Sequence, residues 1–293
     1  MMNRLALPMF VFFLSAAAQD SFDAVLSFAR ELSQKGKHME AAQELMKAEA
    51  VAPENMKMKL CIETGAALRK AGKYADSIRY YEKAAKLSPK VADIYYNMGL
   101  VYYYQGDLKK AIGHYTKALE ISPRYTEALG AMAMAYRDYG LSELAVKTVQ
   151  KAVEIDPNYA GGYNILGNCF EDRGWHDKAI KMYRKAILLR PDYASAFYNL
   201  GTVLDETGQY EAAIDAFSQA LKLDRNADTY YNLGQSYMAA GSLYKAQDAF
   251  KESIKLNPEN EDAYRYLINC LADSGMRREA EFWKGIKKSR FGR

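Results

Sequence analysis

Histidine and cysteine, the residue types that most often carry catalysis or bind metal, occur only three times each in this 293-residue chain. A zinc site or a nucleophile–base pair needs such residues close together, whereas none of these six stands at metal spacing with another or with an acid. An odd number of cysteines also excludes a closed set of disulfides within one chain. Each cysteine is also flanked by helix-patterned sequence, where a buried free thiol is an ordinary core residue. We expect no metal site and three free thiols. The six residues are His38, His114, His176, Cys61, Cys169 and Cys270.

Phosphate binding and acid-pair catalysis have no better support. The glycines do not have the spacing of a P-loop or of a dinucleotide fingerprint, and no Ser, His and Asp can be grouped as a triad. Asp205 and Glu206 are adjacent in a helical pattern, so their side chains point apart. We expect no catalytic residue, no cofactor and no enzymatic activity.

A recurrent pentapeptide suggests binding instead. It reads YYNMG at 95–99, FYNLG at 197–201 and YYNLG at 230–234, with a looser YNILG at 163–167. Asparagine is a poor helix former, but its amide can grip the backbone of an extended peptide. Tyrosine beside it offers rigid, amphipathic contact area. The alternative, left open here, is that the asparagines bond to a neighbouring helix or to water.

The pentapeptides belong to a repeat of about 34 residues. Eight glycines recur with steps of 36, 34, 34, 34, 34, 33 and 34 residues, and a small residue follows each of them by five. Every proline after Pro8 follows one of these glycines by 17 residues. Glycine permits a left-handed backbone at a helix end, proline stops the next helix, and small residues allow close packing. The glycines are Gly36, Gly72, Gly106, Gly140, Gly174, Gly208, Gly241 and Gly275.

The pattern resembles the tetratricopeptide repeat. The residues that match its spacing in one unit are Tyr163, Leu166, Gly167, Phe170, Ala179, Tyr183, Ala186 and Pro191. The resemblance covers residues 22–293 and implies an all-α, right-handed superhelical solenoid of antiparallel helix pairs. We expect units at 22–57, 58–91, 92–125, 126–159, 160–193, 194–226, 227–260 and, in degenerate form, 261–293. The array spans residues 22–275, and a basic capping helix or tail follows at 276–293.

Two units depart from the period. Unit 22–57 carries two extra residues, and unit 194–226 lacks one and has Arg225 in place of proline.

The resemblance also implies an inner groove, lined by the first helix of each pair, that binds an extended or helical segment of a protein or peptide. The family's chaperone-tail clamp of Lys and Asn is absent from the corresponding positions. Lys59, Arg69 and Lys70 would form a basic rim to this groove. The partner-binding residues implied by groove position are Tyr96, Asn97, Tyr103, Tyr104, Asn164, Asn168, Tyr198, Asn199, Tyr231 and Asn232.

The net charge of +4 is unevenly distributed. Residues 276–293 carry +5, which leaves about −1 for the rest of the chain. A body without excess positive charge does not suit nucleic-acid binding. The basic tail is either a solvated helix end or a contact for an anionic lipid or polymer.

The first residues have the form of an export signal. MMNR supplies a positive charge, LALPMFVFFLSAAA is apolar, and Ala16 to Ala18 form a small-x-small cleavage site. About 14 apolar residues are too few to span a bilayer comfortably, so we expect no stable membrane insertion. We expect cleavage of residues 1–18 after Ala18, which would make the protein periplasmic or secreted. The alternative is an uncleaved N-terminal segment that holds the protein at a membrane.

Together these features predict a non-catalytic scaffold for protein–protein interaction. The alternative is a structural subunit or adaptor that assembles an envelope complex through its ends and basic tail, with self-association as one form of such assembly.

Overall fold

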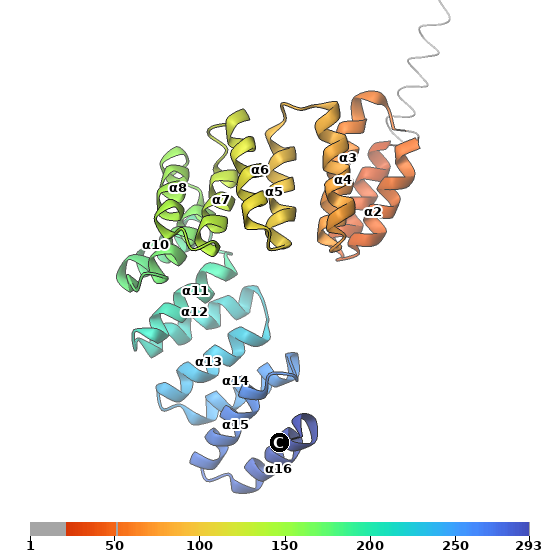
Figure 1. Cartoon of the computed structure of the whole chain (residues 1–293). Coiled ribbons are helices and arrows are strands. Elements are labelled where there is room, and N and C mark those ends of the chain that lie inside the picture. The colour runs from red at the N-terminus through yellow and green to blue at the C-terminus, as the bar shows by residue number, and fades with distance from the viewer. Residues whose placement is uncertain (1–21, 51, 293) are drawn as a thin grey trace, which may run out of the picture. The chain divides into compact units, whose positions relative to one another are not determined.

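The computed structural model describes residues 22–50 and 52–292, and this part of the chain consists of helices and turns without a strand. It has the predicted fold class, an all-α solenoid of antiparallel helix pairs (Figure 1). The export signal predicted at 1–18 lies outside the described residues. The chain divides into two compact units, residues 1–148 and 149–293.

Unit 1 contains helix pairs in which the first helix (helix A) packs against the second (helix B). The opening pair consists of the helical residues 22–34 and α2 (His38–Lys47). The remaining helices are α3 (Lys57–Lys70), α4 (Tyr74–Leu87), α5 (Ala92–Tyr104), α6 (Leu108–Ile121), α7 (Thr126–Asp138) and the first half of α8 (Ser142–Ile155).

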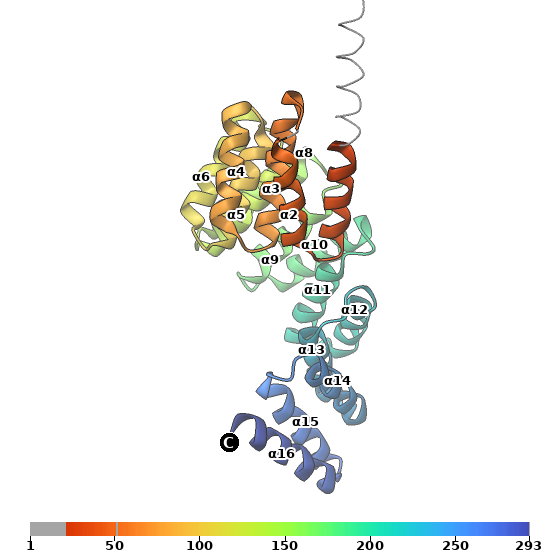
Figure 2. The same ribbon diagram turned by 90° about the vertical axis from the view of Figure 1, so that its right-hand side faces the viewer.

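Unit 2 continues the same alternation, and its helix pairs follow one another in chain order (Figure 2). After the second half of α8 its helices are α9 (Ala160–Glu171), α10 (His176–Leu189), α11 (Ala194–Glu206), α12 (Tyr210–Leu223), α13 (Ala227–Ala239), α14 (Leu243–Leu256), α15 (Glu261–Asp273) and α16 (Arg277–Phe291).

The two extra residues of the first repeat lie in its connection to the second. Two short 3-10 turns, η1 (Ala48–Ala50) and η2 (Glu54–Met56), stand between α2 and α3. Pro53 precedes η2 with an extended backbone, at ψ 146°. Helix B of this pair therefore ends early, and the added length is taken up in turns.

The glycine ladder ends the A helices as predicted. All eight of its glycines have φ between 68° and 84°, the left-handed region that side chains disfavour. At Gly106 the backbone N–H donates to the Tyr103 carbonyl, and the next N–H, of Asp107, donates to that of Tyr102. Both bonds satisfy carbonyls at the end of α5.

From the second repeat on, each helix B that is followed by a repeat proline ends two residues before it, as at Leu87 before Pro89. α12 ends at the same point of its unit without a proline. There Asn226 caps the following helix α13, because its side chain accepts a hydrogen bond from the Thr229 N–H at 2.9 Å. The departure at Arg225 is thus compensated by a cap.

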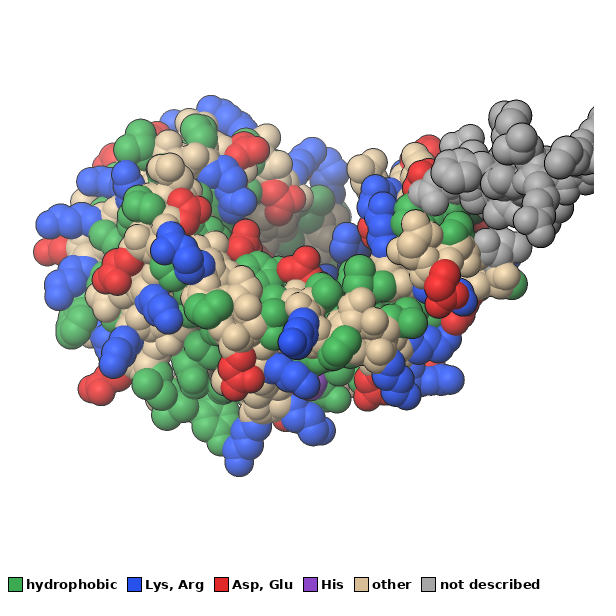
Figure 3. Space-filling model, turned by 90° about the horizontal axis from the view of Figure 1, so that it is seen from above, with side chains coloured by type: hydrophobic (Ala, Val, Ile, Leu, Met, Phe, Trp, Pro, Cys, Tyr) green, Lys and Arg blue, Asp and Glu red, His purple; other side chains and the backbone are tan. Residues whose placement is uncertain are grey.

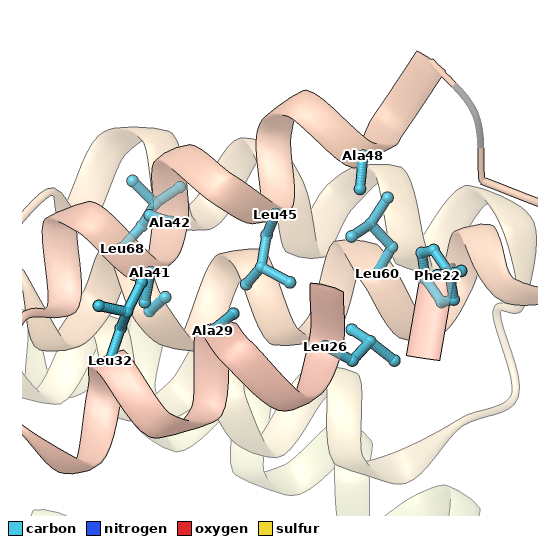
Figure 4. Close-up of a cluster of buried hydrophobic side chains, with 11 residues drawn as sticks. Phe22, Leu26, Ala29, Leu32, Ala41, Ala42, Leu45, Ala48, Leu60 and Leu68 are labelled. Carbon is cyan, nitrogen blue, oxygen red and sulfur yellow. The ribbon is translucent and has the colours of Figure 1, made fainter. Parts of the chain in front are cut away.

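Each helix pair and its successor share a core. In unit 1, Phe22 and Leu26 from residues 22–34 pack with Leu45 of α2 and Leu60 of α3 (Figure 4). In unit 2, the core around Tyr264 of α15 includes residues of α14 and α16. Since a single pair cannot bury its apolar stripe, this sharing holds the array together.

All three cysteines are buried free thiols. Burial raises the pKa of Cys270 to about 11, so the thiol stays protonated and unreactive near neutral pH. The surface, by contrast, mixes charges. Lys and Arg side chains are interspersed with Asp and Glu side chains over the face seen in Figure 3.

Candidate functional site

The ten predicted partner-binding residues lie on four A helices. Tyr96, Asn97, Tyr103 and Tyr104 are on α5 in unit 1. The other six are in unit 2: Asn164 and Asn168 on α9, Tyr198 and Asn199 on α11, and Tyr231 and Asn232 on α13. They therefore form two sets, one in each unit.

The α5 set is an aromatic surface. The Tyr96 ring centroid lies 5.1 Å from that of Tyr125 and 6.1 Å from that of Tyr115, and the Tyr103 and Tyr104 rings meet edge to face at 5.8 Å. Tyr104 is 56% exposed. The guanidinium carbon of Arg69, from α3, lies 5.6 Å from the centre of the Tyr104 ring, within the range of a cation–π contact.

The hydroxyls of this surface are hydrogen-bond donors at neutral pH. Burial, followed by the hydrogen bond to Asp138, holds the pKa of Tyr103 well above its usual value. That bond runs from the Tyr103 hydroxyl on α5 to the Asp138 carboxylate on α7. Burial and the charge of Glu127 likewise raise the pKa of Tyr96.

Asn97 is engaged within its own helix. Its side-chain N–H donates to the Asp93 carbonyl one turn earlier, at 2.8 Å. The asparagine of this pentapeptide is therefore tied to its own backbone, in a way that differs from the asparagines of unit 2.

The unit 2 asparagines form a network between A helices. The Asn199 amide nitrogen on α11 donates to the side-chain oxygens of Asn164 at 3.1 Å and Asn168 at 3.0 Å, both on α9. Asn164 is only 7% exposed. The bonding to a neighbouring helix that the sequence left as an alternative is present here.

Tyr183 of helix α10 joins the same network. Its hydroxyl donates to the Asn168 side-chain oxygen at 2.8 Å and to the Glu171 carboxylate. The network thus links helix B of one repeat to the A helices of two repeats, and its buried polar atoms have partners, as stability requires.

The α11 and α13 residues continue the contacts. The Asn232 amide donates to the Tyr198 hydroxyl at 3.1 Å, and the Tyr231 ring centroid lies 5.8 Å from that of Tyr266. Beside Tyr198 and Asn199, a hollow of about 340 Å³ is lined by the carboxylates of Asp224 and Asp228.

Sequence reasoning missed two buried tyrosines next to this surface. Tyr81 of α4 and Tyr115 of α6 are fully buried, and neither hydroxyl has an acceptor for its proton. A signal was available. The corresponding residue is phenylalanine at Phe217 and Phe250, so the hydroxyl is not needed for packing.

Within residues 22–50 and 52–292 no group of three or more His, Cys, Asp and Glu side chains could hold a metal ion. Over the same ranges, no helix combines the length and the apolar character needed to cross a bilayer.

A helix-pair solenoid whose A helices present aromatic and amide side chains belongs to the class of repeat scaffolds. Models of the tetratricopeptide repeat match residues 92–125 and 227–260, 159–226 and 126–159, and a TPR repeat model matches 65–106. Together they cover residues 65–260 without a gap. The chain therefore belongs to the tetratricopeptide repeat family.

Solved structures agree on the fold. A chain of the APC/C hetero-tetramer Cut9–Hcn1 superposes with a TM-score of 0.70 at 21% identity, over 83% of this chain and 48% of that one. The present chain thus spans about half the length of that relative. A tetratricopeptide repeat protein from Parabacteroides merdae ATCC 43184 gives a TM-score of 0.62 at 19% identity, over 86% and 99% of the two chains. PilF of Pseudomonas aeruginosa superposes with a TM-score of 0.63 at 16% identity, over 75% of this chain and 99% of that one.

No curated protein matches the sequence. At these identities the structural similarities establish the fold alone. Proteins of the tetratricopeptide repeat family are in general non-catalytic scaffolds that bind protein partners, and this chain has the fold of such a scaffold.

Proposed function

We propose that this protein is a non-catalytic scaffold that binds an extended or helical segment of a partner protein on the A-helix surface of its repeats. The observation that carries the proposal is the α5 surface. Tyr104 stands more than half exposed beside Arg69, and exposed aromatic side chains beside arginine are typical of interaction surfaces.

Unit 1 is the better candidate for the main contact. In unit 2 the amides of Asn199 and Asn232 already donate to neighbouring helices. A partner that bonded to them would first have to break those bonds, which lowers the net gain. On α5 the Tyr104 ring can be buried against a partner without first breaking a hydrogen bond between helices, and such burial is favourable.

The direct test replaces the exposed tyrosine. Tyr104→Ala should reduce the recovery of partner proteins that co-purify with the full chain from the envelope fraction, by roughly tenfold if the ring is a central contact. Tyr244→Ala is the matched control, because Tyr244 is the same residue type, 68% exposed, on helix B of unit 2. Equal recovery with both variants would contradict binding at α5.

Assembly through the C-terminal helix is the second candidate. Phe282 of α16 is 63% exposed, close to Arg277 and Arg278 in sequence. Other basic residues of the helix are already paired, since Lys287 contacts Glu261 at 2.9 Å and Arg290 contacts Glu259 at 2.6 Å. An exposed ring one helical turn from Arg278 supports contact with an acidic protein surface.

Deleting this helix would be a poor test, because Trp283 and Phe291 of α16 lie 5.9 Å and 5.6 Å from the Tyr264 ring. Phe282→Ser combined with Arg278→Gln changes the exposed side alone. Loss of assembly with this variant, while Tyr104→Ala still assembles, would favour the second candidate.

Export is part of the proposal. The apolar N-terminal stretch with Ala16 to Ala18 supports cleavage near Ala18 and a periplasmic or secreted location. Sequencing the mature N-terminus tests it. A start at Gln19 is expected, whereas a retained Met1 would favour a protein held at a membrane or kept in the cytosol.

A further inference from the structure

Three buried hydrogen-bond donors on the α5 side of unit 1 lack an acceptor. They are the hydroxyls of Tyr81 and Tyr115 and the Nε–H of Arg69. The tyrosines are 0% exposed. Buried donors without partners are uncommon in native structures and call for a physical reason. An acceptor supplied by a ligand is one such reason.

The three donors belong to one cluster. Arg69 lies against the Tyr104 ring, and Tyr96 connects Tyr104's helix to the Tyr115 ring at 6.1 Å. The positive charge of Arg69 also acts against burial in setting the pKa values of Tyr81 and Tyr115. A Cβ on Gly65, one turn before Arg69 on α3, would lie 2.9 Å from Cζ of Tyr81, which places the guanidinium close to the Tyr81 hydroxyl.

The chain contains a satisfied version of this arrangement. In the repeat at 160–193, Tyr183 occupies the position of Tyr81, and Glu171 occupies the position of Arg69, counted from the start of each unit. There the Tyr183 hydroxyl donates to the Glu171 carboxylate. Where the corresponding ring is Phe217 or Phe250, no hydroxyl needs an acceptor.

For Tyr81 the acceptor is missing because Arg69 stands where Glu171 stands in unit 2, and for Tyr115 that position is occupied by Tyr103. The nearby carboxylates are already engaged: Glu63 with Arg30, and Asp138 with the Tyr103 hydroxyl and, at 3.5 Å, with Arg137. Arg69 forms no ion pair within the described chain. The cluster is thus rich in donors and carries a positive charge, and an acceptor-only anion complements it.

We propose that Arg69, Tyr81 and Tyr115 form a receptor for the side-chain carboxylate of Asp or Glu within an extended, acidic segment of a partner protein. This inference rests on the proposed function and gives the partner its chemistry. Arg69 binds the carboxylate by charge-assisted hydrogen bonds, and a tyrosine hydroxyl donates to it as Tyr183 does to Glu171. The exposed Tyr104 ring moves aside to admit it.

The test uses the full chain and a positional-scanning library of fluorescein-labelled decapeptides with amidated C-termini. Binding is read by fluorescence anisotropy. We expect Asp and Glu to be preferred at one or more positions. Arg69→Gln should remove that preference and weaken the best acidic peptide about tenfold. Lys70→Gln, which removes a neighbouring exposed cation, is the matched control and should keep it.

Tyr81→Phe is a second variant, since it keeps the ring and removes one donor. It should weaken the acidic peptide severalfold and leave neutral peptides unaffected. Arg69→Glu should abolish acidic preference and raise the thermal midpoint, because the introduced carboxylate stands relative to Tyr81 as Glu171 does to Tyr183.

The outcomes separate the inference from the proposed function. Binding without acidic preference, or preference lost equally in Lys70→Gln and Arg69→Gln, overturns the receptor and leaves the scaffold intact. Absence of binding by every peptide counts against both. Binding only when the C-terminus is left as a free carboxylate overturns the side-chain assignment, because the receptor would then read a chain end.

Discussion

Gly99 of α5 and Tyr115 of α6 meet so closely that no side chain fits between them. A Cβ placed on Gly99 would lie 2.4 Å from Cε1 of the Tyr115 ring. The same relationship holds between Gly167 and Tyr183, at 2.4 Å. The repeat glycine therefore sets the distance between helix A and helix B, and the large ring fills the room that it leaves.

Gly99→Ala should destabilise unit 1 by about 1–3 kcal/mol, the usual cost of forcing an extra carbon into a packed interface. The Tyr115 ring is fully buried and cannot swing into solvent. Urea unfolding followed by circular dichroism measures the change. Gly113→Ala is the control, since Gly113 is an exposed residue of α6 with nothing within 4 Å of a Cβ. It should stabilise by about 0.4–1 kcal/mol.

The first repeat already contains the compensated pair, with Ala29 and Leu45 in place of glycine and tyrosine. We therefore predict that Tyr115→Leu recovers part of the stability lost in Gly99→Ala. A double-mutant cycle gives the coupling free energy, expected at about 1 kcal/mol or more for residues in contact. Additive effects would show that the ring and the glycine are not energetically linked.

These packing relationships could largely be predicted from the sequence. Glycine at a regular period implies positive φ at helix ends, as at Gly106, and glycine inside a helix-forming segment implies a close approach, as at Gly99. Both follow from the backbone chemistry of one residue type. Neither requires knowledge of which side chain lies opposite.

Asn199→Ala should destabilise unit 2 by about 1–3 kcal/mol, because it removes the hydrogen bonds from Asn199 on α11 to Asn164 and Asn168 on α9. Asn164 is buried, so water cannot replace the lost bond there. Hydrogen exchange of α9 and α11 amides reports the loss. The comparison variant is Asn97→Ala, whose amide bonds only to its own helix. It should change stability by less than about 0.5 kcal/mol.

The partners of the asparagines could not be predicted from the sequence. The same pentapeptide holds Asn97 bonded within its helix and Asn199 bonded across two helices. What differs is the residue that the neighbouring repeat presents, Asn164 and Asn168 in the second case. Which residue becomes the partner depends on the distance between the A helices of neighbouring repeats. The sequence of a single repeat does not determine that distance.

Tyr81→Phe and Tyr183→Phe should have opposite effects, although both remove a hydroxyl from the same repeat position. Tyr183 loses bonds to Asn168 and Glu171, so its variant should be less stable by about 1–2 kcal/mol. The Tyr81 hydroxyl is buried without an acceptor for its proton, so its removal should be neutral or stabilising. The thermal midpoints of the two variants test this difference. A loss in Tyr81→Phe as large as that in Tyr183→Phe would show that the Tyr81 hydroxyl donates to an acceptor.

The stability of unit 1 should fall in alkaline solution because of Tyr81. Burial raises the pKa of this hydroxyl to about 12, and the charge and hydrogen bond of Arg69 offset only part of the rise. An unfolded tyrosine has a pKa of about 10. The folded state therefore holds the proton more tightly. The stability that results is present below about pH 10 and is lost as the pH rises towards 12. At pH 11 the loss from Tyr81 alone is on the order of 1 kcal/mol.

The pKa values of other tyrosines, among them Tyr103 and Tyr115, are also raised. The dependence of the wild-type unfolding free energy on pH is therefore the sum of several tyrosine contributions. Comparing it with the profile of Tyr81→Phe isolates one hydroxyl. Between pH 9 and pH 11 the variant should lose less unfolding free energy than the wild type, by an amount on the order of 1 kcal/mol. Parallel profiles would mean that Tyr81 ionises in the folded chain as readily as in the unfolded one. The Tyr81 hydroxyl would then have to be exposed to water in the folded chain.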